Sequence, residues 1–103
     1  MKIEDGFKIV KQKLLAALAE GNYQHAERRA IDVKNLLQLG IVSAEEVATI
    51  IRRCNGIHHS CSPHHSAPEV MVHVMKRDGW YIKFFFVDPQ TVFVSVHKQE
   101  KWS

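Results

Sequence analysis

The sequence predicts an α+β fold in which about three N-terminal helices pack on one face of a C-terminal three-stranded antiparallel sheet. Apolar residues recur at helical spacing through the first half, and β-branched and aromatic runs separated by turn residues fill the second. Helices followed by strands, without alternation, are typical of an α+β architecture. The length of 103 residues predicts one domain, with a helical half (1–53), a Cys/His-rich loop (54–68) and an antiparallel meander (69–98).

Three stretches carry the helical pattern. The first helix lies within EDGFKIVKQKLLAALAE and stops at the Gly-Asn pair that follows. The second is expected over about Tyr23–Leu39. Ser43 and Glu46 have the spacing of a capping box, which predicts that a third helix runs from Ala44 to about Arg53.

The strands are expected in EVMVHVMK, WYIKFFFV and TVFVSVHK, with turns at RDG and DPQ. Side chains alternate between the two faces of a strand, and the more apolar set is assigned to the helices. That set is Val70, Val72, Val74, Ile82, Phe84, Phe86, Val92, Val94 and Val96. The opposite face then carries Met71, His73, Tyr81, Lys83, Phe85, Phe93, Ser95 and His97. This assignment requires connecting loops of odd length, since a one-residue shift reverses the faces.

The composition limits the classes of partner. Hydrophobic residues make up 46% of the chain and charged residues 24%, an ordinary balance for a globular domain. No apolar run approaches the roughly 18 residues that span a membrane, and the first residues lack the apolar block of a signal peptide. We therefore expect a cytoplasmic protein without a membrane partner. The net charge of +3 permits a polyanionic partner such as RNA. An exposed sheet edge leaves a homodimer open.

The predicted open face of the sheet gathers groups suited to cleaving RNA. His73 and His97 are candidates for the base and the acid, because a histidine can act as either near neutral pH. Lys83 suits the charge that develops on a phosphate, and Tyr81 can donate a hydrogen bond or a proton. Phe85 can stack on a base. A half-exposed sheet also carries a polar residue at every second position without any catalytic role.

The loop sequence CNGIHHSCSPHH is half Cys and His and has three interpretations. As a zinc site it would use Cys54, His58 or His59, Cys61, and His64 or His65. The six residues between the cysteines exceed the usual zinc spacing of two to four. As a contact loop it would bring His64 and His65 to RNA, and as a solvated connector it would do neither.

The order of these segments resembles the MqsR family of bacterial toxins, the RNA-cleaving members of toxin–antitoxin pairs, which have a RelE-like fold. The resemblance lies in FKIVKQKLLAALAEGN, HAERRAIDVKNLLQLGI, EEVATII, GWYIKFFFV and TVFVSVHK, and so spans most of the chain. It implies a metal-independent endoribonuclease acting on mRNA, without a cofactor and neutralised by a cognate antitoxin. The alternative is a non-catalytic domain whose Cys/His loop holds zinc, with Cys54, His58, Cys61 and His64 as ligands, and binds a protein or a nucleic acid.

The family's functional residues carry over in part. The Tyr of its "YLK"-type strand matches Tyr81, with Lys83 two residues on, and its C-terminal-strand Lys matches His97 or Lys98. Of the residues near the family's sheet Gln, His73 is the one that can replace it. The family's Lys ahead of the sheet has no counterpart, because the His-rich loop occupies that region. The resemblance therefore implies a His-based version of the family's acid–base chemistry.

Overall fold

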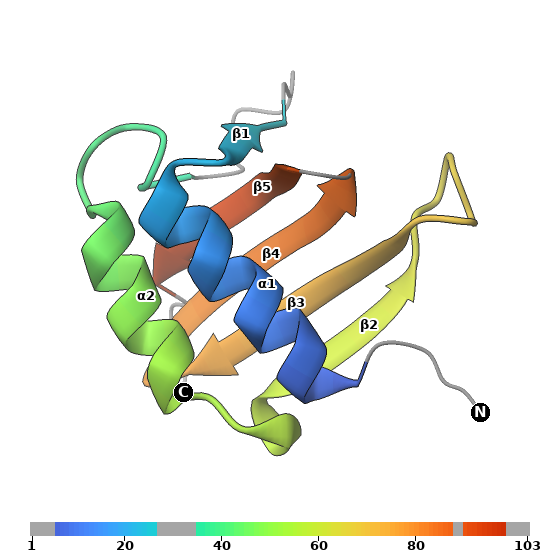
Figure 1. The fold of residues 1–103 in the computed structure, drawn as a ribbon, viewed down its shortest axis with the longest axis horizontal. Helices are drawn as coiled ribbons and strands as arrows, with labels where there is room; N and C mark the ends of the chain where they lie inside the picture. Colours follow the sequence, from blue (N-terminus) through green and yellow to red (C-terminus); the bar gives the residue numbers. More distant parts are fainter. Residues whose placement is uncertain (1–5, 27–34, 88–89, 99–103) are drawn as a thin grey trace.

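Two helices cover one face of a five-stranded mixed sheet in the computed structural model, which describes residues 6–26, 35–87 and 90–98 (Figure 1). The helices are α1 (Phe7–Glu20) and α2 (Ala44–Arg53), and a short 3₁₀ turn, η1, spans Gly56–His58. The strands are β1 (Tyr23–His25), β2 (His59–Pro63), β3 (Met71–Arg77), β4 (Trp80–Val87) and β5 (Gln90–Lys98). They lie in the order β1-β5-β4-β3-β2. We call the two sides of the sheet the helix-covered face and the open face.

The expected three-stranded antiparallel sheet is wrong, because a strand is added at each edge. β1 pairs in parallel with β5, with Tyr23 opposite Thr91, which makes the sheet mixed. β2 comes from the Cys/His-rich segment, expected to be a loop, and pairs antiparallel with β3. The second expected helix, Tyr23–Leu39, is also wrong at both ends: it begins as β1, and residues 36–40 form turns. Its middle, residues 27–34, lies outside the described residues.

The other two helices have the ends that the sequence predicts. α1 stops at Gly21, whose φ of 76° is left-handed and favours glycine at a helix C-terminus. α2 begins with the capping box, in which the Ser43 hydroxyl accepts from the Glu46 amide and the Glu46 carboxylate accepts from the Ser43 amide. The two helices are tied together where the Lys11 Nζ donates to the carbonyl oxygens of Arg52 and Cys54, at 2.9 and 3.0 Å.

The β3–β4 hairpin turns through two residues, Asp78 and Gly79, so the odd loop length expected here is wrong. Both have positive φ, 55° and 83°, as a type I′ turn requires. Arg77 therefore faces Trp80, and the register places His73 opposite Phe84 on the same side of the sheet. The tight turn, rather than the valines of β3, decides which side of that strand meets the helices.

The core lies between the helices and the helix-covered face. Its buried members include Val10, Leu14 and Leu18 of α1, Val47 and Ile51 of α2, and Met75, Ile82, Phe84, Phe93 and Val96 of the sheet. The expected core positions Ile82, Phe84 and Val96 are confirmed. The expectation is wrong for Val72, Val74, Val92 and Val94, which lie on the open face, and for His73 and Phe93, which lie under the helices.

Candidate functional site on the open face

The open face brings Tyr81 of β4 and His97 of β5 directly opposite each other. Their rings are nearly parallel, at 17°, with centroids 5.2 Å apart. Both side chains are partly exposed, so a ligand on this face can reach them. These two predicted catalytic residues therefore form one pair in the folded chain.

His97 has a defined tautomer when it is neutral. Its Nδ1 lies 3.0 Å from the backbone carbonyl oxygen of Lys98. A carbonyl oxygen only accepts hydrogen bonds, so Nδ1 carries the proton and Nε2 keeps its lone pair. The ring can therefore accept a proton at Nε2 while the backbone fixes its orientation.

Two lysines supply positive charge to the same face. Lys83 lies two residues beyond Tyr81 on β4 and faces Ser95 of β5. Lys76 of β3 faces Tyr81, and its Nζ lies 5.7 Å from the centre of the Tyr81 ring. Sequence reasoning identified Lys83 and missed Lys76. The sequence signal that could have identified Lys76 is its position two residues before the Asp-Gly turn. A two-residue turn fixes which face of the sheet each residue of β3 occupies.

A β-bulge in β5 shapes the face beside Lys83. Lys83 pairs with Ser95 and Phe84 pairs with Phe93, so Val94 is an extra residue without an opposite partner. The extra residue shifts the alternation, and Val94 and Ser95 both become buried on this side. Alternation alone, which sequence reasoning used, cannot reveal a bulge of this kind.

The bulge borders a hollow of about 240 Å³ between β5 and the chain that leaves β2. Its lining includes Val72, Lys83, Phe85 and Val94 from the sheet, and His64 and His65 from the loop. Three of the four residues that we expected to bind RNA, namely His64, His65 and Phe85, thus meet here.

Two hydrogen bonds fix the orientation of the His64 ring at this hollow. Its Nδ1 accepts from the backbone amides of Ser66 and Ala67, at 3.0 and 3.2 Å. In this tautomer the proton sits on Nε2, which is left as a donor. The His64 ring is nearly parallel to that of His65, at 12° and 4.8 Å, and meets Phe85 edge-on at 5.5 Å.

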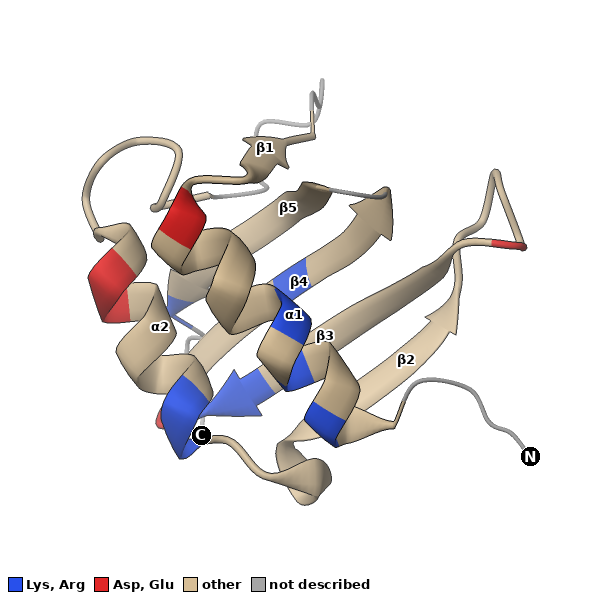
Figure 2. Cartoon of the chain, in the orientation of Figure 1, with Lys and Arg blue, Asp and Glu red and all other residues tan. Residues whose placement is uncertain are grey.

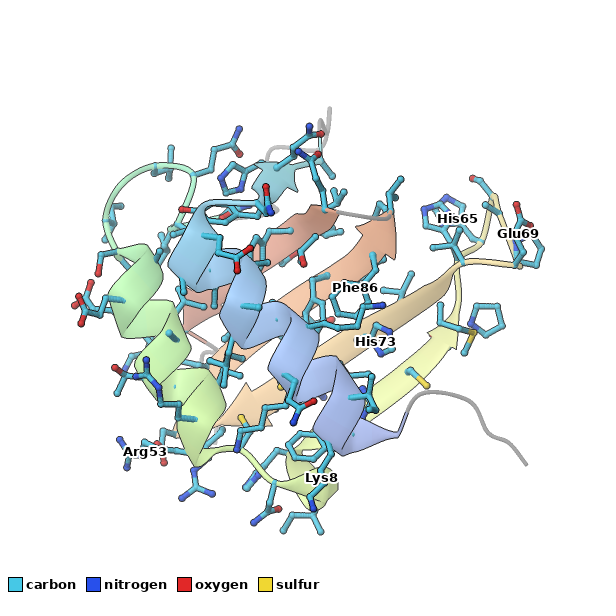
Figure 3. The ribbon with its side chains drawn as sticks, in the orientation of Figure 1. Lys8, Arg53, His65, Glu69, His73 and Phe86 are labelled. Atoms are coloured by element: carbon cyan, nitrogen blue, oxygen red, sulfur yellow. The ribbon has the colours of Figure 1, made fainter. Side chains whose placement is uncertain are left out.

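His73, the remaining predicted catalytic residue, lies on the other side of the sheet (Figure 3). It is 7% exposed and contacts the rings of Phe84 and Phe86. Its Nδ1 lies 3.0 Å from the Nε2 of His59 on β2. The structure therefore does not bring His73 together with Tyr81, Lys83 and His97.

Lys98, expected to contact RNA, is also separated from the open-face group. It faces Trp80, and its Nζ lies 5.5 Å from a ring of that side chain. Trp80 packs against the core under the helices, so Lys98 lies toward the helix-covered face. Lys98 follows His97 directly, and successive residues of a strand point to opposite faces, so its charge lies on the other side of the sheet from the Tyr81–His97 pair.

The four alternative zinc ligands have separate surroundings. The Cys54 thiol is buried and donates to the Ile50 carbonyl oxygen at 3.5 Å, and burial raises its pKa, which opposes the thiolate that a metal needs. The His58 Nδ1 accepts from the Asn55 amide. Cys61 is exposed on β2, and His64 is held by its own loop. Within residues 6–26, 35–87 and 90–98, no three His, Cys, Asp or Glu side chains form a group suited to a metal.

Comparison with known proteins matched no family model, no curated protein and no solved structure. The resemblance to MqsR toxins therefore stays a prediction from the residues quoted above. Neither helix of the described chain has the length and apolar character needed to cross a membrane.

Proposed function

We propose that this protein is an endoribonuclease toxin that cleaves single-stranded mRNA on the open face of its sheet, without a metal ion. The observation that supports this most is the Tyr81–His97 ring pair with Lys83 two residues away on the same strand face. The pair offers one group that accepts a proton and one that donates, beside a fixed positive charge. Metal-independent RNA cleavage requires these three components.

The roles follow from the protonation of each group. His97 Nε2 accepts the proton of a ribose 2′-hydroxyl, and the 2′-oxygen attacks the adjacent phosphorus. Tyr81 donates its phenolic proton to the departing 5′-oxygen as the P–O5′ bond breaks. The products are a 2′,3′-cyclic phosphate and a 5′-hydroxyl, and proton exchange with water restores both side chains.

The lysines stabilise the charge of the transition state. Negative charge grows on the phosphate oxygens as the 2′-oxygen attacks. Two cations lie next to Tyr81 on the open face, Lys83 two residues along β4 and Lys76 on the neighbouring strand β3. In this proposal His73 supports the position of β2 through His59 rather than touching RNA.

The test is incubation of the purified protein with a single-stranded RNA in the presence of EDTA. We expect cleavage with a 2′,3′-cyclic phosphate end, identified by mass spectrometry. His97→Gln and Tyr81→Phe should each lower the rate by about 10²–10⁴-fold, the usual contribution of a general acid or base. Their circular dichroism spectra should match that of the wild type.

His73→Gln is the matched control for this test, because it changes a histidine on the opposite face. It should retain activity at temperatures where it stays folded. Intact RNA with the wild-type protein, or full activity in both His97→Gln and Tyr81→Phe, would rule out this site. A cognate antitoxin is the partner that the proposal expects, and relief of growth arrest by a neighbouring gene product would identify it.

A further inference from the structure

We infer that the hollow beside Lys83 is a subsite for one unstacked base of single-stranded RNA, next to the phosphate that Lys83 holds. This rests on the proposed function and adds to it the form of the substrate. The volume of about 240 Å³ lies below the roughly 300–1,000 Å³ typical of pockets for whole drug-sized ligands. A single planar ring system suits that size better than a larger molecule does.

Three of the side chains that line the hollow carry flat, unsaturated rings. His64 and His65 form a parallel pair, and Phe85 stands edge-on to His64. Bases of single-stranded RNA bind proteins by stacking on such rings, because every base has a π-face. A base in a duplex is already stacked and paired, so this subsite selects an extruded or single-stranded nucleotide.

The aliphatic part of the lining comes from Val72 of β3 and Val94 of β5. Val94 is present there because it is the extra residue of the β5 bulge. Bulges recur beside functional sites, where they redirect a side chain that regular alternation would place elsewhere. Here the bulge places an apolar side chain beside the rings, which favours an uncharged planar ligand over a free phosphate.

Polar groups give the base an orientation. His64 presents an Nε2 proton, since its Nδ1 is occupied by two backbone amides. Lys83 lines the hollow and also lies about 7 Å along the strand from Tyr81, the rise of two strand residues. A nucleotide whose base fills the hollow therefore has its phosphate at Lys83, on the side where Tyr81 and His97 stand.

The test uses wild-type protein and 2′-O-methyl RNA, which lacks the attacking hydroxyl and stays intact during binding. Fluorescence anisotropy compares one oligonucleotide with versions carrying a single abasic residue at successive positions. We expect one abasic position to weaken binding by about 5-fold or more, the lower range for loss of one stacked base. Phe85→Leu and His65→Ala should weaken binding of the intact oligonucleotide and abolish this dependence on position.

Phe86→Leu is the matched control, because it makes the same change one residue along β4 on the helix-covered face. It should keep the dependence on the abasic position. Equal binding of every abasic oligonucleotide, or an unchanged profile in Phe85→Leu, would overturn the subsite.

The cleavage assay separates the two proposals. Cleavage of ordinary RNA with no abasic effect would retain the proposed function and reject the subsite. An abasic effect without cleavage would retain the subsite on a protein that binds RNA without cutting it. Wild-type protein that binds no RNA at all would overturn both.

Discussion

At the scale of single residues, the His59–His73 pair joins two ring nitrogens under the helices. The ring nitrogens lie 3.0 Å apart, and the rings are nearly parallel, at 21°, with centroids 5.2 Å apart. These values place the two nitrogens almost on the line between the ring centres, so one ring donates an N–H and the other accepts it. If both of these nitrogens carried a proton, two N–H groups would point at each other and the hydrogen bond would be lost.

This pair predicts a dependence of stability on pH. Burial lowers the pKa of His59 below its ordinary 6.5, so below about pH 6.5 the unfolded chain binds more protons than the folded chain. The free energy of unfolding should therefore fall as the pH drops from about 6.5 toward the folded pKa, and it should gain nothing from His59 above pH 6.5. Urea denaturation at a series of pH values measures this.

His59→Gln tests the assignment, because glutamine keeps a hydrogen-bonding group without the titration. The fall in stability on acidification should be smaller in this variant. Burial also lowers the pKa of His25, so part of the fall should remain, and His65→Gln provides a control at an exposed position. An identical pH profile in His59→Gln and wild type would contradict the prediction.

At the scale of elements, the Asp78-Gly79 turn determines which residues of β3 lie on each face of the sheet. Gly79 has a φ of 83°, where a side chain strains the backbone even though no atom lies within 4 Å of the added Cβ. Gly79→Ala should therefore lower the free energy of unfolding by about 1–2 kcal/mol, the cost of the left-handed region for other residues. Thermal or urea denaturation measures the loss.

Gly56→Ala is the control for this prediction. Gly56 also has open space around it, but its φ is not in the left-handed region. Its substitution should change stability by less than that of Gly79. Equal effects at the two positions would mean that the hairpin does not depend on the left-handed residue.

The same turn shows why some parts of the fold could be predicted from the sequence and others could not. The ends of α1 and α2 follow from local signals, Gly21 and the Ser43–Glu46 box, and these were predictable. The face of β3 depends on a turn one residue shorter than expected, so His73 was placed with Tyr81 when it belongs beneath the helices. β2 was missed because His, Ser, Cys and Pro have little strand preference, and its pairing comes from β3.

At the scale of the whole molecule, basic residues lie both on the helices and on strands of the sheet (Figure 2), and the strand register places Lys76 and Lys83 on the open face. Arg52 and Arg53 lie in the last turn of α2, while Glu45 and Glu46 lie in its first turn, as the helix dipole favours. Arg53 also pairs with Asp78 at 3.1 Å. The proposed RNA site instead depends on Lys76 and Lys83, on the opposite side.

The positions of the lysine side chains on the two faces predict which of them contribute to RNA binding. Each phosphate contact to single-stranded nucleic acid contributes about 0.7 to the slope of log K against log salt. Lys83→Met and Lys76→Met should each weaken binding and reduce that slope by about this amount. Lys8→Met, on the exposed side of α1, is the control and should leave the slope unchanged. The reverse pattern would place the RNA on the helices.

The parallel pairing of β1 with β5 has a consequence for how the chain folds during synthesis. Residues 23–25 leave the ribosome before their hydrogen-bonding partners, residues 91–93. β5 also supplies the partner of β4, so neither neighbour can be completed before this strand emerges. Pairings between distant segments form slowly because a long loop must close first. The nascent chain therefore carries two unpaired strand edges, at which chaperone binding or aggregation competes with folding until β5 arrives.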